Sequence, residues 1–183
     1  MTELSLTRPR SLPATLVGIV GFATALAAAS QVAIPLPGTP VPITLQPLLV
    51  VLAGFWLGPR AGAASMALYL AAGAAGLPVF APVGPPGIAR LLGPTGGYLI
   101  AYPVAAFAAG WLLTGVSTYL ARFGAAAAGI ALIYLGGAAQ LAILTGSLGG
   151  AFALGILPFV ALDFVKALVA ALIAPRKVHR AFP

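Results

Sequence analysis

Long apolar runs, separated by prolines and glycines, account for most of this chain. Apolar runs bounded by residues that interrupt helices predict helices that cross a membrane. The second and third runs are short for a span. The predicted helices cover Pro13–Ala33, Leu45–Leu57, Ala61–Ala75, Gly96–Thr114, Phe123–Leu144 and Gly149–Ala174.

Two proline-rich segments lie between these runs. Residues 35–42 hold four prolines and cannot sustain a helix. The connection 76–97 also carries several prolines and glycines, yet it is strongly apolar. Non-helical apolar backbone is tolerated at membrane depth only where it is buried in protein or lines a cavity. We therefore expect residues 76–97 to form a lid over a pocket.

Two prolines inside the predicted spans can bend helices around such a pocket. Pro158 frees the backbone carbonyl of Leu154, and Pro103 frees that of Leu99. A tolerated bend with no ligand role is the more common situation in membrane helices.

The composition places all the runs in an integral membrane protein. The chain is 61% hydrophobic and 6% charged, whereas roughly a quarter of the residues of a soluble domain are charged. At about 20 residues per span, six helices with short loops use up the 183 residues. The expected fold is an all-α bundle of six transmembrane helices that forms one domain, residues 1–183, and leaves no room for a soluble catalytic module.

The residue types that the chain lacks limit the kinds of chemistry that we expect of it. The chain has no cysteine, and its single histidine, His179, lies in a basic cluster near the C-terminus. Redox and metal cofactors are therefore not expected. The chain also lacks a glycine-rich loop followed by Lys-Ser or Lys-Thr, so it should not hydrolyse ATP by itself.

The basic residues predict an orientation. If the N-terminus is cytoplasmic, seven of the nine basic residues fall inside, and the net charge of +7 reports orientation in the cytoplasmic membrane rather than nucleic-acid binding. Both termini are then cytoplasmic, with the C-terminal cluster against lipid headgroups. Arg90 falls outside, either in an anion site or in contact with headgroup phosphates. The seven are Arg8, Arg10, Arg60, Arg122, Arg176, Lys177 and Arg180.

Asp163 and Lys166 stand in the middle of the last apolar run. Apart from Glu3, Asp163 is the only acid in the chain. A charge at bilayer depth costs at least about 2.5–3.5 kcal/mol, and the spacing puts both side chains on one helix face. The pair is therefore either an internal strut, as in a channel or structural protein, or a ligand site. A third alternative is an intramembrane enzyme with Asp163 as general base, although the chain offers few polar partners for it.

The first predicted helix carries small residues at a spacing of four, namely Ala23 with Ala27 and Ala25 with Ala29. Such pairs allow close helix approach, so this face can pack internally or against a partner subunit. The same region resembles a signal-peptide cleavage site. We expect the helix to stay uncleaved, because Arg8 and Arg10 belong to the inside-positive series.

Four ordered motifs resemble the BioY family. They are the run Ile34–Gln46, the stretch Gly76–Ala81, the motif Gly93-Pro-Thr-Gly-Gly-Tyr98 and the pair Asp163-x-x-Lys166. The resemblance implies six helices, capture of biotin from outside, and a partnership with a transmembrane coupling protein and two cytoplasmic ATPases of an energy-coupling factor transporter. It also implies that the small-residue face of the first helix contacts the coupling protein.

Biotin offers two ureido N–H donors, one ureido carbonyl and a carboxylate. Asp163 is expected to accept from the ureido nitrogens, Lys166 to donate to the carbonyl and Arg90 to bind the carboxylate. Further candidates for the pocket are Gln46, Tyr98, Tyr102 and Phe80, and the spacing of four residues is expected to put the two tyrosines on one helix face. Two alternatives are left open. Tyr102 equally fits the aromatic belt of a membrane boundary, and an aromatic residue in an apolar loop, such as Phe80, is more often simply buried.

Overall fold

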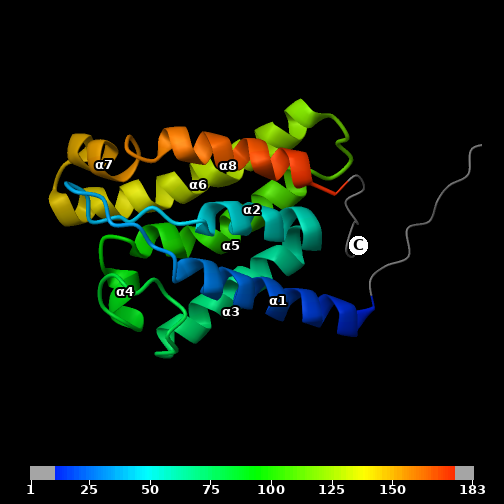
Figure 1. Cartoon of the computed structure of the whole chain (residues 1–183), viewed down its shortest axis with the longest axis horizontal. Coiled ribbons are helices and arrows are strands. Elements are labelled where there is room, and N and C mark those ends of the chain that lie inside the picture. Colours follow the sequence, from blue (N-terminus) through cyan, green and yellow to red (C-terminus); the bar gives the residue numbers. More distant parts are fainter. Residues whose placement is uncertain (1–10, 176–183) are drawn as a thin grey trace, which may run out of the picture.

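The computed structural model describes residues 11–175, and within these residues it consists of helices and loops (Figure 1). One isolated antiparallel bridge, between Ile34 and Ile43, closes the proline-rich loop. The helices are α1 Leu12–Ser30, α2 Gln46–Leu57, α3 Pro59–Ala74, α4 Ile88–Leu92, α5 Gly96–Leu112, α6 Tyr119–Thr145, α7 Leu148–Gly155 and α8 Val160–Ile173.

The predicted spans correspond to α1, α2, α3, α5, α6 and the pair α7–α8. By length and composition, α1 and α6 each suffice to cross a membrane, and α7 with α8, which are bent by 57° relative to each other, suffice if they are counted as one span. The apolar helices α2 and α5 are shorter. The all-helical membrane fold is confirmed, while the predicted continuous last helix is wrong because the chain breaks between Gly155 and Val160.

Pro158 lies in this break and has the effect expected of it. It leaves the carbonyl of Leu154 without an intrahelical donor, and the hydroxyl of Thr39 donates to that oxygen at 2.7 Å. The proline-rich loop therefore supplies the hydrogen bond that the helix lacks. By contrast, α5 continues through Pro103 as one helix.

The two ends of the bundle differ in character (Figure 1). The start of α1 and the end of α8 lie at one end, together with the α2–α3 turn and the start of α6, which carry Arg60 and Arg122. The loop 31–45, the lid helix α4 and α7 lie at the other end. The other inside-positive residues, Arg8, Arg10, Arg176, Lys177 and Arg180, lie outside the described residues.

Glycines bring the backbones of α2, α3 and α5 into contact. A Cβ on Gly54 would lie 2.1 Å from the backbone oxygen of Ala106, and one on Gly62 would lie 2.8 Å from the Cα of Gly54. Helices in lipid associate through close packing rather than through the hydrophobic effect. These glycines flank the α2–α3 turn, so they set how tightly the helices are held at the end of the bundle opposite the lid.

Replacing Gly54 by alanine should destabilise the protein. The added methyl group meets backbone rather than a flexible side chain, and overpacking costs about 1–3 kcal/mol. Gly21→Ala is the matched control on α1, because a Cβ there meets nothing within 4 Å. Thermal unfolding in detergent should show a lower midpoint for Gly54→Ala alone. Equal midpoints for the two variants would contradict this account of the packing.

Candidate functional site

A cavity lies beneath the lid, enclosed by α2, α5, α6, α8 and the two loops at that end of the bundle. About 60 Å³ of it is open to water, which is room for only a few molecules. Six of the seven ligand-site residues expected from the sequence line this cavity, and Tyr102 does not. The six are Gln46, Phe80, Arg90, Tyr98, Asp163 and Lys166.

The charged pair forms a buried salt bridge on the cavity wall. The Nζ atom of Lys166 donates to Oδ1 of Asp163 at 2.6 Å, and Asp163 and Lys166 are 5% and 9% exposed. Asp163 stands in the first turn of α8, where the positive end of the helix dipole stabilises a carboxylate. The break at Pro158 creates this helix start, so the proline places the acid in a favourable field.

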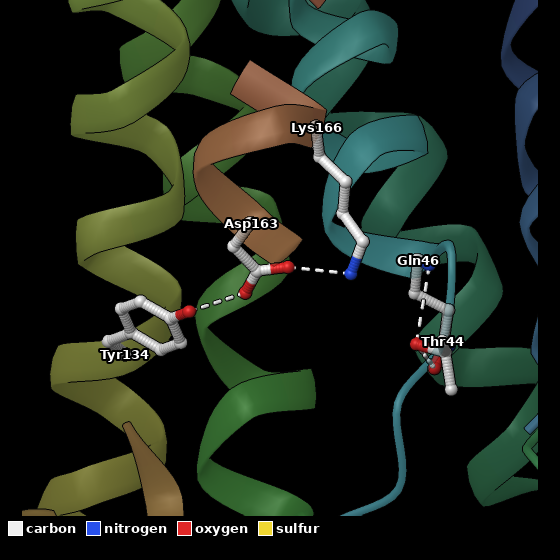
Figure 2. Close-up of polar contacts among 5 residues, drawn as sticks. All are labelled: Thr44, Gln46, Tyr134, Asp163 and Lys166. Carbon is white, nitrogen blue, oxygen red and sulfur yellow. Dashed lines mark hydrogen bonds and ion pairs between the residues drawn. The ribbon is translucent and has the colours of Figure 1, made fainter. Parts of the chain in front are cut away.

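The second carboxylate oxygen of Asp163 is held by α6. The hydroxyl of Tyr134 donates to Oδ2 at 2.5 Å. Figure 2 shows Tyr134 on one side of Asp163 and Lys166 on the other, with Gln46 and Thr44 beyond Lys166. Sequence reasoning missed Tyr134, because a single tyrosine inside an apolar run gives no sign of which neighbour it meets.

Gln46 forms a polar patch on the opposite wall. Its side-chain nitrogen donates to the hydroxyl of Tyr69 at 2.9 Å, and its oxygen accepts from Thr44 Oγ1 at 3.2 Å. The ring of Tyr69 meets Phe80 edge-on at 5.4 Å between centroids. Thr44 and Tyr69 were not predicted from the sequence. Together these contacts fix the amide of Gln46 and connect it to the lid.

Arg90 organises the lid. Its guanidinium donates to the backbone carbonyls of Pro85, Val83 and Ala81, which engages three of its five N–H groups. Burial lowers the pKa of Arg90 from its usual value, but an arginine in a protein keeps its charge. At 5% exposure Arg90 does not lie on the surface, which argues against the headgroup alternative.

Polar side chains at the end of α1 and on α6 hold the lid in place. Ser30 Oγ donates to the carbonyl of Val79 at 2.6 Å, and Gln31 Nε2 donates to that of Phe80 at 3.2 Å. On the other side, Gln140 Nε2 donates to the carbonyl of Gly93 at 2.7 Å. Phe80, 6% exposed, is both buried and part of the cavity wall. The predicted lid is thus a folded cover over the cavity.

The two tyrosines expected to share a face of α5 lie at different depths. Tyr98 lines the cavity and donates its hydroxyl to the carbonyl of Gly155 at 2.7 Å, at the break after α7. Tyr102 is 3% exposed and packs in the core. Tyr102 therefore lies neither in an aromatic belt at the surface nor on the cavity wall.

The alanines of α1 belong to two faces. Ala23 is buried and Ala27 packs against the core, whereas Ala25 is exposed and Ala29 is half-buried. Of the four candidates for a partner interface, Ala25 and Ala29 therefore face away from the core. Among the described residues, no group of His, Cys, Asp or Glu side chains has an arrangement suited to a metal ion.

Comparisons with known proteins show relatives along the chain. The family model described as "BioY family" matches residues 2–183. The "Probable biotin transporter BioY" of Pyrococcus horikoshii is 49% identical over 137 residues, which are 75% of this chain and 80% of the relative. The "Biotin transporter BioY" of Thermotoga maritima is 39% identical over 143 residues, 78% and 84% of the two chains.

A solved structure has the same fold. It is the "S-component for biotin from an ECF-type ABC transporter", which matches with a TM-score of 0.81 and 28% identity. The match covers 88% of this chain and 89% of that one. Because the family model covers the chain from residue 2 to residue 183, this protein belongs to the BioY family.

Proposed function

We propose that this chain captures biotin as the substrate-binding component of an energy-coupling factor transporter. Its relatives are named as biotin transporters, and the matching structure is the biotin S-component of such a transporter. The observation that carries the proposal is the buried pair of Asp163 and Lys166, which lines a cavity under a folded lid.

The pair has the hydrogen-bonding groups that a ureido ring requires. Asp163 accepts from a ureido N–H group and Lys166 donates to the ureido carbonyl. Charge-assisted bonds of this kind are about twice as strong as neutral ones, and low polarity around them penalises any ligand that leaves a partner unsatisfied. Selectivity thus follows from the cost of an unpaired buried charge.

Binding must involve movement of the walls. The 60 Å³ open to water is too small for a bicyclic ring with a tail, since ligand pockets measure about 300–1,000 Å³. Displacing part of the lid, where Phe80 and Arg90 border the cavity, widens it, and we propose that the ureido group also opens the contact between Lys166 and Asp163. The ureido group then replaces the ion-pair contact that it breaks.

The alternative functions have less support. A strut needs no cavity beside it, whereas both members of this pair border one. An intramembrane enzyme with Asp163 as base is not favoured, because the relatives reported above are named as transporters. The binding role explains both the pair and the lid.

Loss of either charge should abolish high-affinity binding. Asp163→Asn removes the carboxylate that accepts from the ureido group, and truncating one partner of a buried charged contact to a ligand costs about 2–5 kcal/mol, so biotin affinity should fall about a hundredfold. Glu3→Gln removes the only other acid and should bind as the wild type does. Calorimetric titration of the purified proteins measures both. Unchanged affinity in Asp163→Asn would remove the pair from the site.

We further propose that Arg90 binds the biotin carboxylate with the donors that the lid leaves available. Arg90→Met should weaken binding of biotin but spare biotinamide, whose tail is neutral. The ratio between the two affinities should fall by about tenfold or more, as expected for a hydrogen bond to a charged group. An equal loss for both ligands would show that Arg90 acts only through the lid backbone.

The proposed partners are membrane lipid, a transmembrane coupling protein and two cytoplasmic ATPases. The exposed side of α1 that carries Ala25 and Ala29 is the proposed contact with the coupling protein, because small residues let helices approach closely. We propose that the chain lies in the cytoplasmic membrane with both termini inside. Arg60 and Arg122, at the end opposite the lid, support this orientation.

A bulky residue at Ala25 should block assembly and leave biotin binding intact. Ala25→Trp fills the space that a partner helix would occupy, whereas Ala139→Trp adds the same bulk on an exposed position of α6. Co-purification with co-expressed coupling protein and ATPases should fail for Ala25→Trp only. Normal assembly by Ala25→Trp would exclude this face of α1 as the interface.

A further inference from the structure

Asp163 has a partner that its charge pairing does not explain. Tyr134 lies on α6 and reaches α8, where its hydroxyl donates to Oδ2 while Lys166 occupies Oδ1 (Figure 2). The two carboxylate oxygens therefore have separate partners on separate helices. One oxygen faces the side of Lys166, Thr44 and Gln46, and the other faces α6.

The surroundings of Tyr134 show why the second oxygen needs a donor. Tyr134 and Asp163 line the lid cavity, and they also line a groove between α6 and α8. The other residues of that groove are apolar, among them Phe123, Ile130 and Phe164. A carboxylate oxygen turned toward this groove without a donor would be buried and unsatisfied, which is costly in an environment of low polarity.

The ring of Tyr134 is held in place. It packs against two groups of buried apolar side chains, one around Tyr69 and Phe80 and the other around Phe55 and Ile130. A tyrosine has only two side-chain torsions, so a packed ring delivers its hydroxyl to a defined point. The bond to Oδ2 thus fixes the plane of the carboxylate.

We propose that Tyr134 is a positioning residue for recognition: by binding Oδ2 it directs Oδ1 toward Lys166 and toward the ligand. The inference rests on the proposed function, in which a ureido N–H donates to Asp163. Without Tyr134 the carboxylate can rotate, and Oδ2 competes with the ligand for the donor of Lys166.

Two tyrosine variants on α6 separate positioning from packing. Tyr134→Phe removes the hydroxyl that meets Asp163. Tyr119→Phe, the matched control, removes a hydroxyl that donates to the backbone oxygen of Leu168 on α8 at 3.3 Å. Calorimetric titration should show biotin affinity about tenfold or more weaker for Tyr134→Phe and unchanged for Tyr119→Phe. Introducing 4-aminophenylalanine at position 134 retains a donor and should restore most of the affinity, even if Tyr134→Phe folds poorly.

Infrared spectroscopy measures the carboxylate band of Asp163, which would stay unchanged if Tyr134 had a purely structural role. In a Glu3→Gln background, Asp163 is the only acidic side chain, and subtracting the spectrum of the additional variant Asp163→Asn isolates its carboxylate band. We expect this band to shift in Tyr134→Phe and not in Tyr119→Phe, without any ligand present.

The two measurements distinguish this inference from the proposed function. If the wild type binds no biotin but the band shifts in Tyr134→Phe, the proposed function is overturned while the contact between Tyr134 and Asp163 stands. An unshifted band in Tyr134→Phe, or biotin affinity equal to that of Tyr119→Phe, overturns the positioning role of Tyr134 even if the wild type binds biotin.

Discussion

The buried salt bridge between Asp163 and Lys166 is the interaction on which the rest of this structure depends. A charged pair inside an apolar bundle persists only if every charge and lone pair is matched. Here Lys166 neutralises the carboxylate, Tyr134 holds its far oxygen, and the start of α8 adds a favourable dipole. The break that creates this helix start is itself stabilised, because Thr39 binds the carbonyl that Pro158 leaves free.

The lid and the packing of the helices determine the surroundings of this pair. Glycines hold α2, α3 and α5 in backbone contact at the end of the bundle opposite the lid, while the polar groups of the site lie at the lid end. There the lid is held by side chains from α1 and α6 and by the guanidinium of Arg90. A ligand site of this kind combines closely packed helices with a lid that is held by a few hydrogen bonds. Those hydrogen bonds can break and re-form when the ligand binds.

The sequence predicted the features that follow from local chemistry. Apolar runs located the spans, Pro158 marked a bend, and the rarity of charge singled out Asp163 and Lys166. Contacts between residues far apart in the chain could not be predicted from the sequence. No local pattern pairs Tyr134 with Asp163 or Thr39 with Leu154. Helical spacing also shows which side of a helix a residue lies on, but not how deeply the residue is buried in the protein. For this reason the spacing grouped Tyr98 with Tyr102, although only Tyr98 lines the cavity.

A structure of the chain with biotin bound is the most direct test of the central claim. We expect the ureido group to lie between Asp163 and Lys166, with an N–H donating to Oδ1, the carbonyl accepting from Nζ and the contact of Tyr134 with Oδ2 retained. Biotin bound elsewhere, with the 2.6 Å contact between Lys166 and Asp163 intact, would contradict it and leave the pair as an internal strut.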